Sequence, residues 1–224
     1  MIHRNIVNYE QMKTKKNYLR EILAEPEKVA LLVVDMQRDF YAPDGNTAKR
    51  GKPVVRMQGV AVKMDRFVKA MADKGVRTVF TRYVSGEGVT PINLKKVADK
   101  EGYSLACEKG SGLEEIFGVK VPEGVVVIDK PHFDAFAQTS LLEMLREKGI
   151  KTILITGVRT EICVDATAKR ATSEGFDTIV ISDLVATYDD KEDVHNQVLN
   201  FFDKYYGFVA RSDIVTQIIG ENLS

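Results

Sequence analysis

The sequence predicts an α/β fold, a doubly wound, six-stranded and mostly parallel sheet with helices on both faces in a Rossmann-type three-layer arrangement. Short β-branched runs alternate with stretches of helical periodicity, which is typical of βαβ units. One run, Val29 to Asp35 (VALLVVD), is apolar until its last residue, as a strand buried on both faces requires. We expect this run to be the central strand.

The other elements follow in chain order. A helical pattern from Val60 to Met71 stops at Gly75, a residue suited to a helix C-terminus, and a second strand begins at Val76. Further strands are expected at residues 125–129, 152–156, 176–182 and 207–210, with helices around 141–149, 161–175 and from about 190. The last of these helices is expected to present one apolar face formed by Val194, Val198, Phe201 and Phe202.

The chain divides into an N-terminal helical extension, residues 1–28, and a single domain, residues 29–224. A length of 224 residues with 44% hydrophobic residues suffices for one sizeable core. Residues 6–24 fit an amphipathic helix. The irregular excursions 41–58 and 85–123 are expected to cover a pocket.

Composition narrows the class of partner. Lys+Arg and Asp+Glu both number 32, so the net charge of zero gives no electrostatic case for nucleic acid or an anionic membrane. No apolar run approaches the roughly 20 residues that span a bilayer. Two cysteines make no disulfide framework, and we expect a cytoplasmic protein that acts on a small molecule.

Three polar residues stand where predicted strands end, and ligands bind at that edge of a parallel sheet. Asp35 closes the first strand, Lys130 follows the third, and Cys163 lies just beyond the fourth. If these strands are neighbours, a carboxylate, an ammonium group and a thiol meet at one edge. That set suits nucleophilic acyl chemistry.

The position of Cys163 favours a reactive thiol. Thr160 is a good N-cap, which places the cysteine in the first turn of the next helix, where the helix dipole and Lys130 favour the thiolate. Asp35 could then accept its proton. Taken singly, each residue has an ordinary explanation, because a buried cysteine often only fills core space, and a strand-end aspartate or lysine often forms a turn or is solvated.

Three segments together resemble the isochorismatase-like cysteine hydrolases, a family that includes nicotinamidases, N-carbamoylsarcosine amidohydrolase, biuret hydrolase and ureidoacrylate amidohydrolase. The segments are LLVVDMQRDF from Leu31, DKPHFDAF from Asp129 and ITGVRTEICVDATAKRA from Ile155, in the family's order. The resemblance covers about residues 29–215. It implies the isochorismatase-like fold.

The resemblance also implies roles for the residues. Asp35 is the general base, Lys130 holds the thiolate, and Cys163 forms an acyl-enzyme that water hydrolyses. A cis peptide is expected at Val158–Arg159, with the amides of Arg159 and Cys163 as the oxyanion hole. The implied function is a cysteine-dependent amidohydrolase for a small amide, carbamoyl or ureide compound, assembled as a homodimer or homotetramer.

Departures from the family argue against the metal-binding branch. Nicotinamidases resemble this chain in the triad but carry histidines after the second strand that bind a metal, whereas this stretch has none. The histidines present, His3, His132 and His195, lack that spacing, so no metal site and no cofactor are expected. Two alternatives stay open: a metal-dependent nicotinamidase with unusual ligands, and a non-catalytic oligomeric binding protein of the same fold.

The substrate contacts are the least determined part. Phe40, Phe133 and Phe136 flank the aspartate and lysine motifs and are candidates for pocket walls, although aromatic residues at these spacings also suit a core. Gln37 and Arg82 are the candidate polar anchors. Asp134 and Cys107 are expected to cap a local turn and to play no part, respectively. The sequence leaves the identity of the substrate open.

Overall fold

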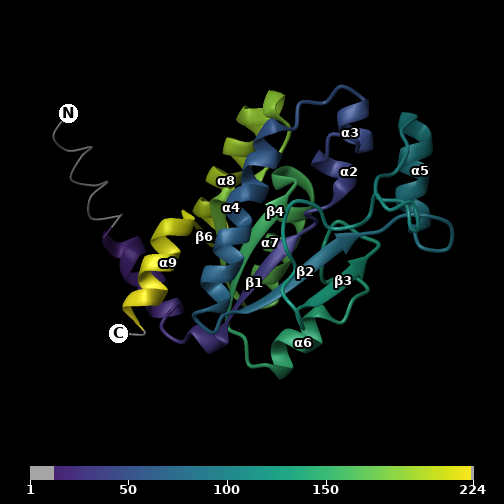
Figure 1. The fold of residues 1–224 in the computed structure, drawn as a ribbon. Helices are drawn as coiled ribbons and strands as arrows, with labels where there is room; N and C mark the ends of the chain where they lie inside the picture. The colour runs from purple at the N-terminus through teal and green to yellow at the C-terminus, as the bar shows by residue number, and fades with distance from the viewer. Residues whose placement is uncertain (1–12, 223–224) are drawn as a thin grey trace.

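The computed structural model describes residues 13–222 and contains one six-stranded sheet in the order β3-β2-β1-β4-β5-β6 (Figure 1). Every pairing in it is parallel. The strands are β1 (Val29–Val34), β2 (Arg77–Tyr83), β3 (Val126–Lys130), β4 (Thr152–Val158), β5 (Asp177–Ala186) and β6 (Phe208–Ala210). The predicted fold class is confirmed.

The apolar run of β1 is central, as predicted, with β2 on one side and β4 on the other. All six of its residues are buried, because helices cover both faces of the sheet. Val34, its last residue, is in register with Thr81 of β2 and Gly157 of β4. The carboxyl ends of these three strands therefore lie side by side, which determines where the site forms.

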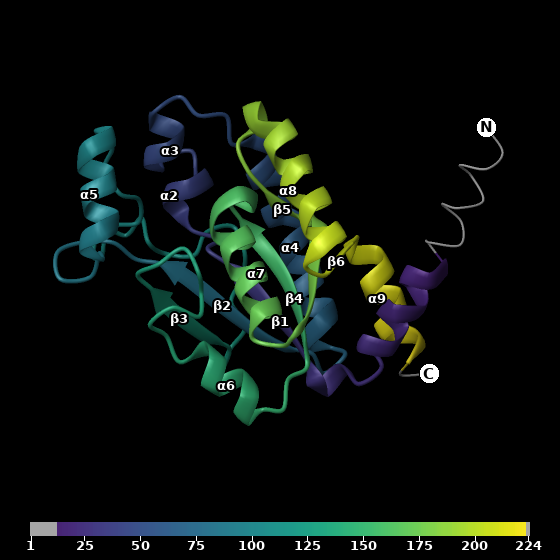
Figure 2. The same ribbon diagram turned by 180° about the vertical axis from the view of Figure 1, so that it is seen from behind.

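Helices form two layers, one on each face of the sheet (Figures 1 and 2). One layer contains α4 (Val55–Ala72) and α9 (Ser212–Glu221), whose buried residues pack with the odd-numbered residues of β1. The other contains α6 (Leu141–Glu147), α7 (Asp165–Ser173) and α8 (Glu192–Tyr205), which pack with the even-numbered ones. The alternation of the pleat thus divides the core into two apolar clusters.

The buried face of α8 differs from the expected one. His195, Leu199 and Phe202 face the core, whereas Val194 is 39% and Phe201 is 51% exposed. Val194, Val198 and Phe201 follow the same i, i+4, i+7 spacing as the observed stripe, so spacing could not decide between the two faces, and of the predicted set only Phe202 is buried. His195 lies within the buried stripe, and because it is polar the sequence pattern did not indicate that this face is buried.

The two excursions lie on the same side of the molecule, near the carboxyl ends of β1 and β2 (Figures 1 and 2). The short helix α2 (Arg38–Tyr41) leads into the first, which holds α3 (Asn46–Lys49), and the second holds α5 (Ile92–Glu101). Short 3-10 turns, η1 (Pro26–Lys28) and η3 (Asp189–Lys191), precede β1 and α8.

A helix at residues 13–22 lies against α9 (Figures 1 and 2). Leu19 and Leu23 are buried in the same apolar cluster as α9, and the Asn222 side-chain amide donates to Leu23 O at 2.9 Å. The part of the predicted extension at residues 1–12 lies outside the described residues. Within residues 13–222, no helix is both long enough and apolar enough to cross a membrane.

Gly157 is the tightest point between β1 and β4. Its φ is +111°, a value that L side chains rarely adopt, and the β4–β5 register shifts between Ile155 and Gly157. A Cβ at this position would lie 2.7 Å from the carbonyl carbon of Val34 and closer still to its oxygen. Only glycine lets β4 approach β1 at the position just before Asp35.

We expect Gly157→Ala to lower the free energy of unfolding by at least about 3 kcal/mol, because the methyl group adds a backbone clash to the positive-φ strain. The matched control is Gly149→Ala, where φ is also positive at +65° but a Cβ would meet nothing within 4 Å. That variant should lose only about 1–2 kcal/mol. Equal losses in urea denaturation would show that the close approach to β1 is unimportant.

Candidate active site

Asp35 stands at the carboxyl end of β1 with its backbone in the left-handed region, at a φ of +51°. This conformation is uncommon for residues other than glycine, and aspartate tolerates it better than most. The Asp35 amide donates to Thr81 O at 3.2 Å, and the Thr81 hydroxyl donates to Asp35 Oδ1 at 2.8 Å. β2 thus fixes both the backbone and one carboxylate oxygen of Asp35.

Lys130 is the last residue of β3 and reaches the same point from two strands away. Its Nζ lies 2.7 Å from Asp35 Oδ2, and neither side chain has any exposed surface. The same Nζ donates to the carbonyl oxygens of His132 at 2.9 Å and Phe133 at 3.1 Å. These contacts compensate for burying an ammonium group. The condition that the strands of Asp35 and Lys130 are neighbours is not met, because β2 lies between β1 and β3. The two side chains meet nevertheless.

Cys163 is delivered by β4 through the turn that follows it. The Val158–Arg159 peptide is cis, as the resemblance implied, and Thr160–Val164 form a π-helical turn before α7. Cys163 is 5% exposed, and its thiol interacts electrostatically with the Asp35 carboxylate and the Lys130 ammonium group. The three predicted side chains therefore converge at one edge of the sheet.

The local structure around Cys163 corrects one expectation. Thr160 caps no helix, because its hydroxyl is hydrogen-bonded to His195 Nδ1 at 2.9 Å and the chain enters α7 through the π turn. Cys163 consequently lies within that turn and not in the first turn of α7. Sequence spacing alone gave no sign of a π turn, a rare element that occurs mostly as a single turn and frequently at functional sites.

The protonation state also differs from the sequence-based expectation of a resting thiolate. Burial raises the pKa of the Cys163 thiol, and although Lys130 opposes this effect, it does not overcome it. For Lys130, burial disfavours the charged form, yet Asp35 and Cys163 outweigh it, so the pKa of the ammonium group is raised. The resting site therefore holds a neutral thiol beside a buried ion pair.

Asp35 retains capacity to take the thiol proton. Its Oδ1 is occupied by Thr81, but no donor in residues 13–222 makes a well-aligned hydrogen bond to Oδ2, despite the short distance from this oxygen to Lys130. A carboxylate oxygen without an aligned donor has lone pairs available to accept a hydrogen bond from the thiol. Cys163 is the nearby group that can supply one.

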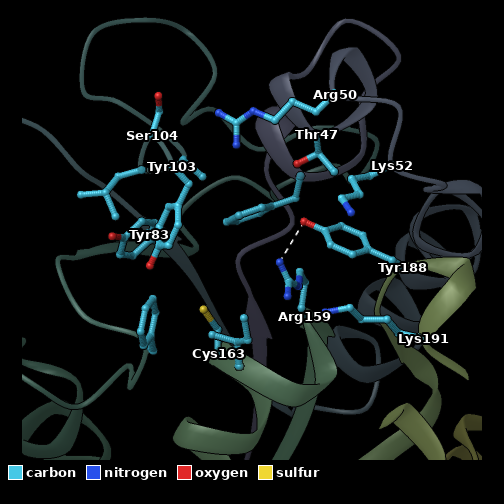
Figure 3. A pocket seen from close by; sticks show the side chains of 15 residues that line it. Thr47, Arg50, Lys52, Tyr83, Tyr103, Ser104, Arg159, Cys163, Tyr188 and Lys191 are labelled. Atoms are coloured by element: carbon cyan, nitrogen blue, oxygen red, sulfur yellow. Dashed lines mark hydrogen bonds between the residues drawn. The ribbon is translucent and has the colours of Figure 1, made fainter. Parts of the chain in front are cut away.

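Cys163 opens into a cavity of about 430 Å³, within the range of small-molecule sites (Figure 3). Phe40 and Phe133, two of the predicted pocket walls, line it. Both excursions contribute to it, as predicted, through Thr47, Arg50 and Lys52 from the first and Tyr103, Ser104, Leu105 and Ala106 from the second. Tyr83, Arg159, Ile162, Tyr188 and Lys191 complete the lining.

The structure places three of the expected substrate contacts elsewhere. Gln37 uses its side-chain amide to bind the backbone of Tyr83 and Glu114. Arg82 forms ion pairs with Asp129 and Glu115. Phe136 is stacked on Phe176 in the core. These side chains hold the edge of the sheet and its helical layer together, and their polar groups are already paired.

Sequence reasoning missed several lining residues. Tyr83 is 3% exposed, and its hydroxyl has no hydrogen-bond partner among the described residues. Burial raises its pKa, so the phenol stays protonated and can donate to a ligand. The sequence signal that could have identified Tyr83 as a lining residue was its place at the carboxyl end of β2.

Asp134 accepts a hydrogen bond from the Phe136 amide at 2.9 Å, so it caps a local turn as expected.

Arg159 is held by two partners at the cavity wall. Its guanidinium donates to Glu161 Oε1 at 2.7 Å and to the Tyr188 hydroxyl at 2.8 Å, and it lies over the Tyr188 ring. Burial would raise the pKa of Glu161, but Arg159 dominates and holds it below its usual value.

No cluster of three or more metal-ligating side chains occurs in residues 13–222.

A family model described as the isochorismatase domain matches residues 29–213, a region that includes the whole sheet and all three converging side chains. The chain belongs to the isochorismatase family. The matched region starts at β1 and leaves the helix at residues 13–22 outside it. The family resemblance recognised in the three sequence segments is confirmed.

Relatives of known activity share most of the chain. The ureidoacrylate amidohydrolase RutB of Methylobacterium radiotolerans is 26% identical over 204 residues, 84% of this chain and 78% of that protein. A cysteine hydrolase from Pseudomonas syringae superposes with a TM-score of 0.77 at 21% identity, over 88% of this chain and 95% of that one. A pyrazinamidase of Pyrococcus horikoshii in complex with zinc superposes with a TM-score of 0.66 at 26% identity, over 82% of this chain and 99% of that one. The family and these relatives make the chain a hydrolase, in agreement with the sequence prediction.

The buried ion pair yields a stability prediction. Lys130→Met should cost about 3–5 kcal/mol of unfolding free energy, because it leaves Asp35 charged and unpaired in the interior. Adding Asp35→Asn to that variant should restore part of the loss, since the remaining amide is neutral. Lys69→Met, which breaks the exposed Lys69–Asp73 pair, is the control and should cost no more than about 0.5 kcal/mol. Strictly additive single losses in a double-mutant cycle would contradict the coupling.

The thiol yields a labelling prediction. Iodoacetamide should modify Cys163 before Cys107, because Cys163 lines the cavity whereas Cys107 is fully buried. The rate at Cys163 should rise steadily from about pH 7 to pH 9, since a raised pKa means that thiolate forms only as the pH increases. Mass spectrometry of the labelled peptides measures both. A rate that is already at its plateau at pH 7 would indicate a resting thiolate.

Proposed function

We propose that this protein is a cysteine-dependent amidohydrolase that cleaves the C–N bond of a small amide, carbamoyl or ureide compound through an acyl-enzyme intermediate. The observation that carries the proposal is the meeting of Cys163 with the buried Asp35–Lys130 pair at the wall of a small-molecule-sized cavity. A core that only needed to fill space would gain nothing from burying two charges beside a thiol.

In the first half-reaction, the Cys163 sulfur attacks the carbonyl carbon as Asp35 Oδ2 removes the thiol proton. The proton transfer accompanies attack, because the thiol is neutral at rest. Lys130 stabilises the negative charge that passes from Asp35 to sulfur and then to the carbonyl oxygen. Collapse of the tetrahedral intermediate breaks the C–N bond, and protonated Asp35 gives its proton to the leaving nitrogen.

The oxyanion hole belongs to the same proposal. The Arg159 amide immediately precedes the π turn after β4 and the Cys163 amide lies within it, so both are on the segment that carries the sulfur. Backbone donors on a rigid segment stabilise a developing oxyanion without reorganising. The Arg159 side chain is fixed by Glu161 and Tyr188, which limits motion of this segment.

In the second half-reaction, water replaces the departed amine and attacks the thioester. Asp35 takes a proton from that water, and the new tetrahedral intermediate expels the sulfur, which recovers the proton from Asp35. The products are a carboxylic or carbamic acid and the amine or ammonia. Cys163, Asp35 and Lys130 return to their starting states, so no cofactor is consumed.

Two alternatives lead to different measurements. A metal-dependent nicotinamidase is supported by the zinc-bound pyrazinamidase relative, which shares the fold over 82% of this chain. A non-catalytic binding protein of this fold would bind small amides without turnover. The expected homodimeric or homotetrameric assembly and the cytoplasmic location stay predictions.

Cys163→Ala should abolish ammonia or amine release from a panel of primary amides, carbamoyl compounds and ureides while leaving the unfolding transition intact, because the acyl-enzyme needs the sulfur. Cys107→Ala is the matched control, since Cys107 lies outside the cavity, and it should keep full activity. Mass spectrometry of the rapidly quenched wild-type protein should show an adduct on Cys163. Turnover by folded Cys163→Ala would rule out the covalent route.

Exhaustive chelation separates the metal-dependent alternative. If the three residues suffice, the chelated protein should retain its activity and its unfolding midpoint. Loss of activity that zinc restores would transfer the assignment to the metal-dependent branch. A wild-type protein that binds panel compounds in calorimetry but turns over none of them would favour the non-catalytic alternative.

A further inference from the structure

The charge distribution around the cavity is one-sided. Arg50, Lys52, Arg159 and Lys191 line it, and no acidic side chain does. In Figure 3, Lys52, Arg159 and Lys191 lie on one side of the cavity, Tyr83, Tyr103 and Ser104 lie on the opposite side, and Arg50 extends across the top between them. A chain with zero net charge therefore concentrates positive charge at its candidate active site.

Among the acidic residues near this side, Asp189, Glu192 and Glu161 have partners of their own, whereas Asp190 is exposed and does not line the cavity. Asp189 accepts from the amides of Val55 and Arg56, and Glu192 is paired with the Arg56 side chain. Glu161 is paired with Arg159. Within the described part of the chain, Arg50, Lys52 and Lys191 consequently form no ion pair of their own, and each of them lines the cavity. Three cations are left without a counter-charge.

From this arrangement we propose that the substrate is an anion: an amide, carbamoyl or ureido compound that carries a carboxylate, which is bound by Arg50, Lys52 and Lys191 while its carbonyl faces Cys163. The proposal rests on the proposed amidohydrolase function and specifies its substrate class. Arginine and lysine bind carboxylates through charge-assisted hydrogen bonds, which are stronger than neutral ones.

Hydroxyl groups and aromatic walls complete the recognition. Tyr188 accepts a hydrogen bond from Arg159, so its own proton is free to be donated toward a carboxylate. Across the cavity, the unpartnered Tyr83 hydroxyl and the rings of Phe40 and Phe133 offer a neutral surface for the body of the substrate. The site therefore has a cationic end and an uncharged end, which gives a small substrate one orientation.

A matched pair of substrates tests the proposal. 3-Ureidopropionate carries the carboxylate, and 3-ureidopropanol replaces it with a neutral hydroxymethyl group. We expect kcat/KM for the anion to exceed that for the alcohol by at least about ten-fold, and the ratio to shrink when salt rises from about 0.05 to 0.5 M, because salt screens exposed charges. Shorter and longer ureido acids map the distance between the two ends.

Variants assign the effect to the three cations. The triple variant Arg50→Gln, Lys52→Gln, Lys191→Gln should raise KM for the anion by about ten-fold or more, with kcat and the alcohol reaction little changed, since uniform binding is what it removes. Lys49→Gln is the matched control, because Lys49 is an exposed cation of α3 that does not line the cavity. It should leave the preference for the anion unchanged.

Calorimetry on Cys163→Ala separates this proposal from the amidohydrolase proposal. Binding of 3-ureidopropionate that the triple variant loses would support the anion site even if no compound were turned over. Equal kcat/KM for anion and alcohol, unaltered in the triple variant, would overturn the anion site while leaving amide hydrolysis by Cys163 standing. A preference for the anion that Lys49→Gln removes equally would also overturn it, because general surface charge would then be the cause.

Discussion

The ion pair between Asp35 and Lys130 is the constraint on which the rest of the site depends. Two charges with no exposed surface are stable only where every neighbouring group compensates for them. Thr81 and the carbonyl oxygens of His132 and Phe133 provide that compensation: Thr81 belongs to β2, and the two carbonyl groups belong to the loop after the edge strand β3. Strands β1, β2 and β3 must therefore pair in the correct register before the ion pair can form. Correct folding of the sheet and correct assembly of the site thus depend on the same contacts.

The fold was largely readable from the sequence because its signals are local. A strand buried on both faces must be apolar throughout, and the run at Val29–Val34 shows this directly. The face of α8 was not readable, because His195 occupies a buried position through its hydrogen bond to Thr160, a contact between residues 35 positions apart. Burial that depends on a distant partner leaves no periodic signal.

The candidate site likewise contains residues that could be predicted from the sequence and others that required the structure. Asp35, Lys130 and Cys163 could be named because polar residues at strand ends are conspicuous against apolar neighbours. The roles assigned to Gln37 and Arg82 could not be judged, since their partners come from the second excursion and from β3. The state of the Cys163 thiol required the structure as well, because desolvation is a property of the packed surroundings and not of the residue's place near a helix.

The cavity walls and the reacting groups come from different parts of the chain. Strand ends hold the chemistry, whereas Arg50, Lys52 and the segment at Tyr103–Ala106 belong to excursions that leave the sheet after β1 and β2. Gly157 shows how little change the strand ends tolerate, while exposed loops accept substitution and length change at modest cost. Selectivity in this scaffold is thus open to redesign by loop exchange, with the bond-breaking machinery left untouched.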